Sequence, residues 1–140
     1  MPQQTDEGVP VRIATLGTHH ESLVGRKLRI AGRNMSYDVD TGFLILLDDS
    51  VGVLVDISLA LERERTFPWM KERFSPVEVL GYLEHSDEEL VVPAIPPHAS
   101  APEVDTHLVL RAIVVVPSSD LSLEVWNNVV TEMEVELGIL

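Results

Sequence analysis

The chain has 140 residues, no cysteine and a formal net charge of −13. This length suits one domain with its own core, and the missing cysteines exclude disulfides and thiolate metal sites and favour a reducing compartment. The opening residues MPQQTDEGVP lack the basic and apolar regions of a signal peptide, and no apolar run is long enough to span a membrane. We therefore expect a soluble intracellular protein.

The charge is unevenly distributed along the chain. Residues 1–75 carry nine basic and 11 acidic side chains, whereas residues 76–140 carry one basic and 12 acidic side chains. An acidic surface repels phosphate groups. Any nucleic-acid contact is therefore expected on the first half of the chain or on a partner, although acidity alone more commonly serves solubility.

The first half of the chain alternates apolar runs with turn residues. Residues 1–10 are predicted to be a flexible terminus, and residues 11–24 form a lead-in compatible with a short helix. Gly32 interrupts the first long strand, which suits a bend or bulge at a barrel corner. Hairpin turns are predicted at 40–42 and 48–50, where Asp, Thr, Gly and Ser gather. The predicted strands cover 27–38, 43–47 and 51–57.

The second half continues with fewer strands and one long helix. Residues 58–74 have a helix-like pattern that becomes irregular and breaks at Pro68. The Pro-rich, acidic stretch 86–107 has no periodicity and is predicted to be a mobile loop. Residues 117–120 end the last strand and are predicted to cap the closing helix. The predicted strands cover 76–84 and 108–116, and the predicted helix covers 119–137.

This order of elements predicts an all-β domain with a C-terminal helix. Three meandering strands, a helical connection between strands three and four, two further strands and a closing helix match the five-stranded OB-fold barrel. In a closed barrel one strand face fills the interior, and a helix or partner covers part of the outer face. We expect a single OB-fold domain over residues 11–137.

The closing helix is apolar around an unusually wide part of its circumference. At about 100° per residue its apolar side chains cover roughly 200°, whereas covering one core needs only about 100°. Two apolar surfaces are therefore expected, and the barrel can cover only one of them. The alternative is a helix buried deep in its own fold. The predicted partner-binding residues are Leu121, Leu123, Val125, Trp126, Val129, Val130, Met133 and Leu137.

Two clusters combine features that suit single-stranded nucleic acid. In the stretch 67–74, aromatic Trp69 lies near Lys71 and Arg73, and stacking aromatics beside cations hold single strands without reading sequence. The alternative is that these aromatics plug one end of the barrel. On the first strand, Arg29 and Arg33 are four residues apart and should project from the same side. Such charges also serve to protect a strand edge from aggregation.

No catalytic constellation, metal site or cofactor site emerges from the sequence. The phosphate-binding glycine loop and the nucleophile elbow are both missing, and the Asp48-Asp49 pair falls in a predicted turn where carboxylates cap the backbone. The five histidines include no pair at the i,i+4 helical spacing, and they lack the second-shell hydrogen-bonding residues that accompany zinc ligands. We therefore expect a protein without enzymatic activity, bound metal or cofactor.

Several short motifs together resemble one small family. The run Val24-Gly25-Arg26-Lys27-Leu28-Arg29, followed by Gly32-Arg33 and Tyr37-Asp38, resembles the first strand of the smallest subunit, Ten, of the telomere-capping CST complex. The runs 53–55, 79–83 and 121–133 follow in matching order, so the resemblance covers about residues 11–137. The long Pro-rich loop and the acidic second half depart from that pattern. The smallest subunit of replication protein A is nearly as similar.

The resemblance implies a function without catalysis. It implies an OB-fold subunit that pairs through its C-terminal helix with a larger OB-fold subunit, Stn, in a heterodimer or heterotrimer at chromosome ends in the nucleus. The larger subunits would make most contacts with single-stranded telomeric DNA. The alternatives are a replication protein A small subunit and an acidic protein-binding adaptor barrel. The candidate nucleic-acid contacts are Arg29, Arg33, Tyr37, Trp69, Lys71 and Arg73.

Overall fold

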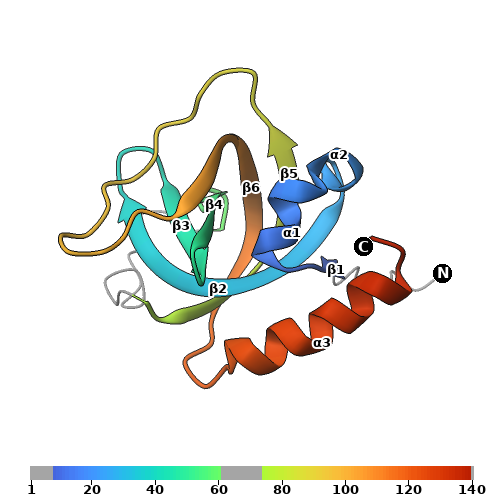
Figure 1. Ribbon diagram of the computed structural model, residues 1–140. Coiled ribbons are helices and arrows are strands. Elements are labelled where there is room, and N and C mark those ends of the chain that lie inside the picture. Colours follow the sequence, from blue (N-terminus) through green and yellow to red (C-terminus); the bar gives the residue numbers. More distant parts are fainter. Residues whose placement is uncertain (1–7, 61–73, 140) are drawn as a thin grey trace.

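A closed β-barrel forms the centre of the computed structural model, which describes residues 8–60 and 74–139 (Figure 1). A short parallel strand, β1 (Val9–Pro10), precedes the barrel strands and pairs with the start of the first of them, within the terminus predicted to be flexible. The barrel strands are β2 (Lys27–Asp38), β3 (Phe43–Asp48), β4 (Val51–Asp56), β5 (Pro76–His85) and β6 (Glu103–Pro117).

The barrel closes because β2 is long enough to pair with two neighbours. Its first half, from Lys27 to Arg33, is antiparallel to β5, and its second half, from Arg33 to Asp38, is antiparallel to β3. The parallel pairing of β4 with β6 completes the ring. The predicted five-stranded OB barrel is confirmed. The predicted helical connection between the third and fourth barrel strands falls mainly on residues 61–73, outside the described residues.

Gly32 lies next to Arg33, the residue at which β2 changes its partner from β5 to β3. A Cβ atom at this glycine would lie 2.6 Å from Ile13 Cδ1 and 2.9 Å from Leu46 Cγ, so no larger residue fits. The register shift between β2 and β3 comes slightly later, between Asn34 and Ser36. The β-bulge of this strand therefore lies beyond Gly32, and the glycine itself is required by close packing.

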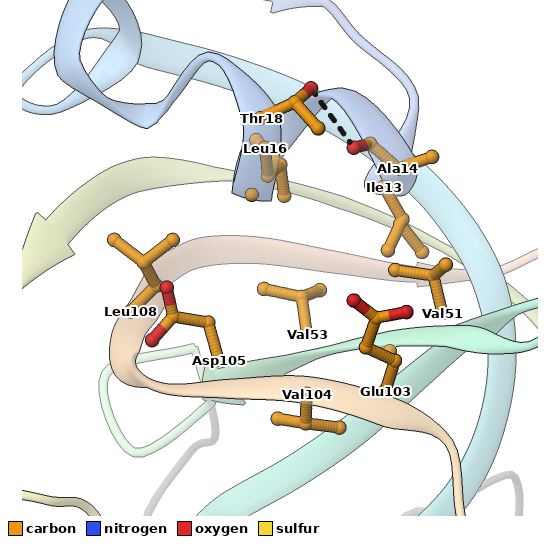
Figure 2. Close-up of a pocket in the computed structure, with 12 residues that line it drawn as sticks. Ile13, Ala14, Leu16, Thr18, Val51, Val53, Glu103, Val104, Asp105 and Leu108 are labelled. Atoms are coloured by element: carbon orange, nitrogen blue, oxygen red, sulfur yellow. Dashed lines mark hydrogen bonds between the residues drawn. The ribbon is translucent and has the colours of Figure 1, made fainter.

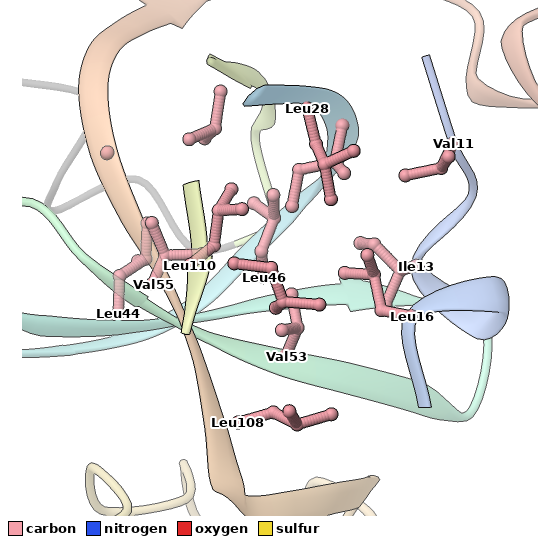
Figure 3. Packing of buried hydrophobic residues seen from close by; sticks show 14 of the residues in the cluster. Val11, Ile13, Leu16, Leu28, Leu44, Leu46, Val53, Val55, Leu108 and Leu110 are labelled. Atoms are coloured by element: carbon pink, nitrogen blue, oxygen red, sulfur yellow. The ribbon is translucent and has the colours of Figure 1, made fainter. Parts of the chain in front are cut away.

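The barrel interior is filled by aliphatic side chains from alternating strand positions (Figure 3). A short helix, α1 (Ile13–Thr18), closes one end of the barrel and buries Ile13 and Leu16 in this core. A second short helix, α2 (His20–Leu23), follows and buries Leu23. Among the core residues are Leu28, Leu44, Leu46, Val53, Val55, Leu108 and Leu110.

A second apolar cluster lies outside the barrel core, beneath the Pro-rich segment. We call residues 86–102 the strap. The strap has no helix or strand, yet it packs on the barrel, and Ser36 Oγ donates a hydrogen bond to the Ala94 carbonyl at 2.6 Å. Leu90, Val92, Ile95 and Ala99 of the strap contact a buried group that consists of Met35, Ile45, Leu54 and Val109.

The strap therefore differs from the mobile loop that its composition suggested. The last part of the predicted loop is also not irregular, because β6 begins at Glu103. The physical reason is that the segment contains aliphatic residues spaced among its prolines, and these find an apolar outer sheet face to cover. Burial of such side chains offsets the entropy cost of ordering the segment.

The closing helix, α3 (Leu123–Glu136), runs along the side of the barrel and contacts β1 and β2 (Figure 1). It begins later than predicted, because residues 119–122 first make a turn in which the Leu121 amide donates to the Ser118 carbonyl. The cap is Ser122, whose hydroxyl accepts a hydrogen bond from the Val125 amide at 3.3 Å. The predicted cap within residues 117–120 is thus displaced by two residues or more.

Candidate partner-binding surface

One face of α3 anchors the helix to the barrel. Leu123 and Val130 are buried on this face, and the Asn127 side chain donates to Asp48 Oδ1 at 3.0 Å. The fully buried Glu134 accepts hydrogen bonds from Arg12, at 2.9 Å from the backbone amide and 2.8 Å from Nε. Because these anchors are spaced three and four residues apart, they form one stripe along the helix.

The flank of α3 next to this stripe remains apolar and open to solvent. Val125 is 60% exposed, Val129 is 51% exposed and Leu137, which follows the helix, is 55% exposed. Trp126 and Met133 lie between the exposed flank and the anchoring stripe, and both are half-buried. The wide apolar arc of the helix is therefore divided, with one edge on the barrel and the other in water.

A groove of about 300 Å³ runs between this flank and the barrel. Trp126, Val129 and Met133 form its helix side, and Arg29 of β2 forms part of its barrel side. The Trp126 indole nitrogen is buried and has no hydrogen-bond partner among the described residues. A buried N–H without an acceptor is costly, so this side chain lowers the stability of the protein relative to one with a satisfied indole.

Arg29 connects the groove to a second apolar patch on the barrel. It pairs across the sheet with Leu80 of β5, and Leu80 pairs with Val114 of β6. A smaller depression of about 70 Å³ is lined by Arg29, Leu80, Val114 and Val116 among others. Both valines are 45% exposed. We call the exposed flank of α3, its groove and this β6 patch together the α3 surface.

The predicted partner-binding residues thus divide into three groups. Leu123 and Val130 are buried against the barrel and hold the helix in place. Leu121 is half-buried in the turn before the helix and Trp126 and Met133 are half-buried in the groove. The exposed members that a partner can reach without rearrangement are Val125, Val129 and Leu137.

The three candidate nucleic-acid contacts that the structure describes, Arg29, Arg33 and Tyr37, have different surroundings. Arg29 lines the groove beside α3, whereas Arg33 is exposed further along β2 and donates from Nη1 to the Phe74 carbonyl at 3.1 Å. Tyr37 is half-buried and packs against the barrel core. Burial, and then the nearby Asp38 and Asp56, raise the pKa of its phenol above the usual value. Trp69, Lys71 and Arg73 lie outside the described residues.

The strap covers part of the outer face of β3 and β4. In OB barrels the face of the second and third strands, here β3 and β4, and the loop between the last two strands bind oligonucleotides. In this chain that loop is the strap, and its side chains cover Ile45 of β3 and Leu54 of β4. The contacting cluster is aliphatic, with one methionine, and so lacks the stacking rings that single-strand sites use.

Two cations among the described residues form ion pairs within the protein itself. Arg12 pairs with Glu134. Arg111 Nε donates to Glu84 Oε2 at 2.7 Å, and this bond and the adjacent negative charge raise the pKa of the guanidinium. These pairs reduce the positive charge that the barrel can offer to phosphate groups.

Sequence reasoning did not identify several residues that shape this surface. Glu134 and Asn127 interrupt the apolar pattern of the helix, and nothing in the local sequence shows that they face the barrel. Their partners, Arg12 and Asp48, lie 122 and 79 residues away. Val114 and Val116 belong to a continuous apolar run, LVLRAIVVV, so alternation does not reveal which of them face outward.

The histidines do not form a metal centre in the described part of the chain. The rings of His20, His85 and His107 lie in a row, with centroids 6.4 and 6.1 Å apart. Within residues 8–60 and 74–139, no three His, Asp or Glu side chains are arranged to hold a metal ion. Over the same residues, no helix has the length and apolar character needed to cross a membrane.

A closed five-stranded barrel with this connectivity, a plugging helix and a closing helix defines an OB-fold protein. Comparison with solved structures agrees with that class. A chain of the S. pombe Stn1–Ten1 complex superposes with a TM-score of 0.60 at 17% identity, covering 95% of this chain and 97% of that one. The S. pombe telomere capping protein Ten1 superposes with a TM-score of 0.58 at 16% identity, covering 91% and 97%.

A third similar structure is a chain of U. maydis replication protein A bound to single-stranded DNA. Its TM-score is 0.51 at 17% identity, with 92% of this chain and 91% of that chain covered. No family model and no curated protein sequence matches the chain. At these identities the likeness shows the fold, and the expected resemblance to the Ten and replication protein A subunits is confirmed at that level.

Proposed function

We propose that this protein is a non-enzymatic OB-fold subunit that pairs through α3 with a larger, Stn-like OB-fold subunit. The assembly would bind single-stranded telomeric DNA and act in end protection and replication at chromosome ends in the nucleus. The proposal is supported by the match to nearly the full length of a chain from the Stn1–Ten1 complex and to Ten1 alone.

The single observation that carries the proposal is the exposed apolar flank of α3. Covering the exposed half of a valine or leucine contributes about 1 kcal/mol, so Val125, Val129 and Leu137 together contribute about 3 kcal/mol. Association costs about 4–15 kcal/mol. The helix alone is therefore insufficient, and the rest of the α3 surface, including the patch around Val114, must add contact area.

The α3 surface is mainly apolar on both sides of Arg29. This side chain lies between the groove on α3 and the depression at Val114, where Glu78 is also among the lining residues. We therefore propose that the partner covers this surface with the apolar face of an amphipathic helix.

In this proposal the larger subunits make the main contacts with DNA. The usual oligonucleotide face of this barrel is filled by the strap, and 12 of the 23 acidic residues lie in residues 76–140 beside a single cation. The protein would stabilise its partner and add peripheral contacts, for which Arg33 is the exposed cation of the described β2 strand.

Two valines of α3 provide a matched test of the interface. Val129 is 51% exposed on the proposed flank, and Val135 is 60% exposed on the other side of the helix, about 120° away. We expect V129E to weaken binding to the larger subunit at least 100-fold, measured by calorimetry with the purified partner. The circular dichroism and melting temperature should remain close to those of the wild type.

The control V135E introduces the same charge at a similar exposure and should bind within about threefold of the wild type. The partner itself is identified by affinity purification from the source cell and mass spectrometry. Wild-type affinity of V129E would show that α3 does not carry the interface, and equal losses in both variants would show that its exposed flank is not the specific contact face.

The superposition on replication protein A favours a second candidate, a small subunit acting in general replication and repair. The two candidates share the helix-mediated pairing and differ in the partner that co-purifies. An adaptor barrel without nucleic acid is separated from both by crosslinking to a single-stranded telomeric oligonucleotide in the native assembly. An assembly that does not crosslink would support the adaptor.

A further inference from the structure

A second concave site lies at the end of the barrel that α1 closes. It is a cleft of about 420 Å³ between α1 and the adjoining parts of β4 and β6 (Figure 2). This volume falls within the range of about 300–1,000 Å³ that is typical of binding pockets. The cleft shares no lining residue with the α3 surface.

The wall of the cleft is apolar and rigid. Ile13 and Leu16 of α1 face Val53 of β4 and Leu108 of β6 across it, and all four side chains belong to the barrel core. Because core side chains are held by close packing, the cleft is a preformed shape. Val51, which is half-buried, extends the apolar wall toward the solvent.

Two carboxylates stand at the entrance. Glu103 and Asp105 are two residues apart on β6, so their side chains project from the same face of the strand, toward the cleft (Figure 2). Val104, between them, points the opposite way and packs under the strap. Asp105 Oδ1 also accepts a hydrogen bond from the His107 amide at 2.9 Å, which fixes one carboxylate.

The charges around the cleft all favour a cation. Its lining residues include two acidic side chains and no basic one. Asp49 is exposed in the turn that leads into β4, two residues before Val51 in the sequence. The whole chain carries a net charge of −13. Phosphate groups and acidic peptides are therefore repelled, whereas lysine and arginine side chains are attracted.

We propose that this cleft binds a basic segment of another protein, in which an aliphatic residue stands next to lysine or arginine. The aliphatic side chain enters between α1 and β4, and the cation lies between the carboxylates of Glu103 and Asp105. The apolar wall supplies contact area, and the exposed carboxylates supply selectivity for charge more than affinity. This function is separate from pairing through α3, so either one can fail without the other.

The test uses the full 140-residue chain with isotope-labelled methyl groups. A peptide of sequence acetyl-LKLRL-amide is titrated and compared with acetyl-LELEL-amide at the same salt concentration. We expect the basic peptide to shift the methyl signals of Val51, Val53 and Leu108 in a saturable way. The acidic peptide should leave them unchanged. A lack of saturable shifts at these methyl groups would overturn the proposal.

Variants separate a specific cleft from general attraction to an acidic protein. E103Q/D105N should raise the Kd for the basic peptide about tenfold, whereas the control D120N/E124Q, which removes two exposed carboxylates near the start of α3, should change it less than twofold. Equal losses in both double variants would show nonspecific attraction and reject the site.

A third variant tests the shape of the cleft without altering its charge. Gly17 lines the cleft, and a Cβ atom there would meet no atom within 4 Å. G17L should fill the opening and weaken binding at least fivefold, whereas G17A should bind like the wild type. Undiminished binding by a folded G17L would place the peptide elsewhere and contradict the proposal.

Discussion

Among individual residues, the ion pair of Arg12 with Glu134 is decisive for the position of the closing helix. Glu134 is fully buried, whereas the Arg12 side chain is 27% exposed. The carboxylate also accepts the backbone amide of Arg12, so a single side chain satisfies two donors ahead of α1. Burying a carboxylate is costly, and these bonds offset that cost.

We expect E134Q to lower the free energy of unfolding by about 1.5–3 kcal/mol, because a charge-assisted bond becomes a neutral one. The control is E132Q, an exposed position on the same helix, which should change stability by less than about 0.5 kcal/mol. Urea unfolding followed by circular dichroism measures both. Equal effects in the two variants would mean that the buried pair adds nothing to stability.

Among the structural elements, the strap shows how an irregular segment becomes a fixed part of a barrel. Its prolines restrict the backbone and so reduce the entropy lost on ordering. Its aliphatic side chains close a sheet face that would otherwise be an exposed apolar patch. The contact removes the usual oligonucleotide site and stabilises the sheet beneath it.

Two residues of the strap test this role. Ile95 packs on the outer cluster, whereas Val91 is 63% exposed. We expect I95D to lower the free energy of unfolding by about 1–3 kcal/mol and to make the strap sensitive to limited proteolysis. V91D should resemble the wild type in both measurements. If I95D and V91D behave alike, the strap does not seal the sheet.

At the scale of the whole molecule, the distribution of charge limits how strongly the protein can bind DNA. Nine of the ten basic residues lie in residues 1–75, and the second half contributes β6 and α3 with a strong excess of acids. A chain that neutralises only two or three phosphates shows a slope of log K against log salt of about −1.4 to −2. In the proposed assembly, strong binding to DNA is therefore expected from the other subunits.

We expect the purified subunit to bind single-stranded telomeric DNA more weakly than about 10 µM at physiological salt, with such a shallow slope. Fluorescence anisotropy over a range of salt concentrations measures both quantities. In the assembled complex, R33E should reduce affinity about threefold or less. Nanomolar binding by the isolated subunit would assign the main DNA site to this chain.

Much of the barrel was predictable because its signals are local. Apolar runs separated by Asp, Gly and Ser turns indicated the strands, and Gly32 stands where close packing leaves no room for a side chain. The candidate partner surface was predictable in part, since the width of the apolar arc of α3 depends only on helix geometry. Which apolar residues of that arc face the barrel was not predictable, because the half-buried Asn127 and the fully buried Glu134 share the inner face.

The sequence by itself determined the order of elements, the five-stranded barrel and a closing helix with more apolar surface than one barrel face can cover. Periodicity and turn residues act over a few positions, and they are sufficient for those features. Only the tertiary structure decided three contacts. The strap packs on the outer sheet face, Arg12 pairs with Glu134, and Glu103 and Asp105 face α1 across a cleft. These contacts join segments distant along the chain, so their formation depends on the closed barrel.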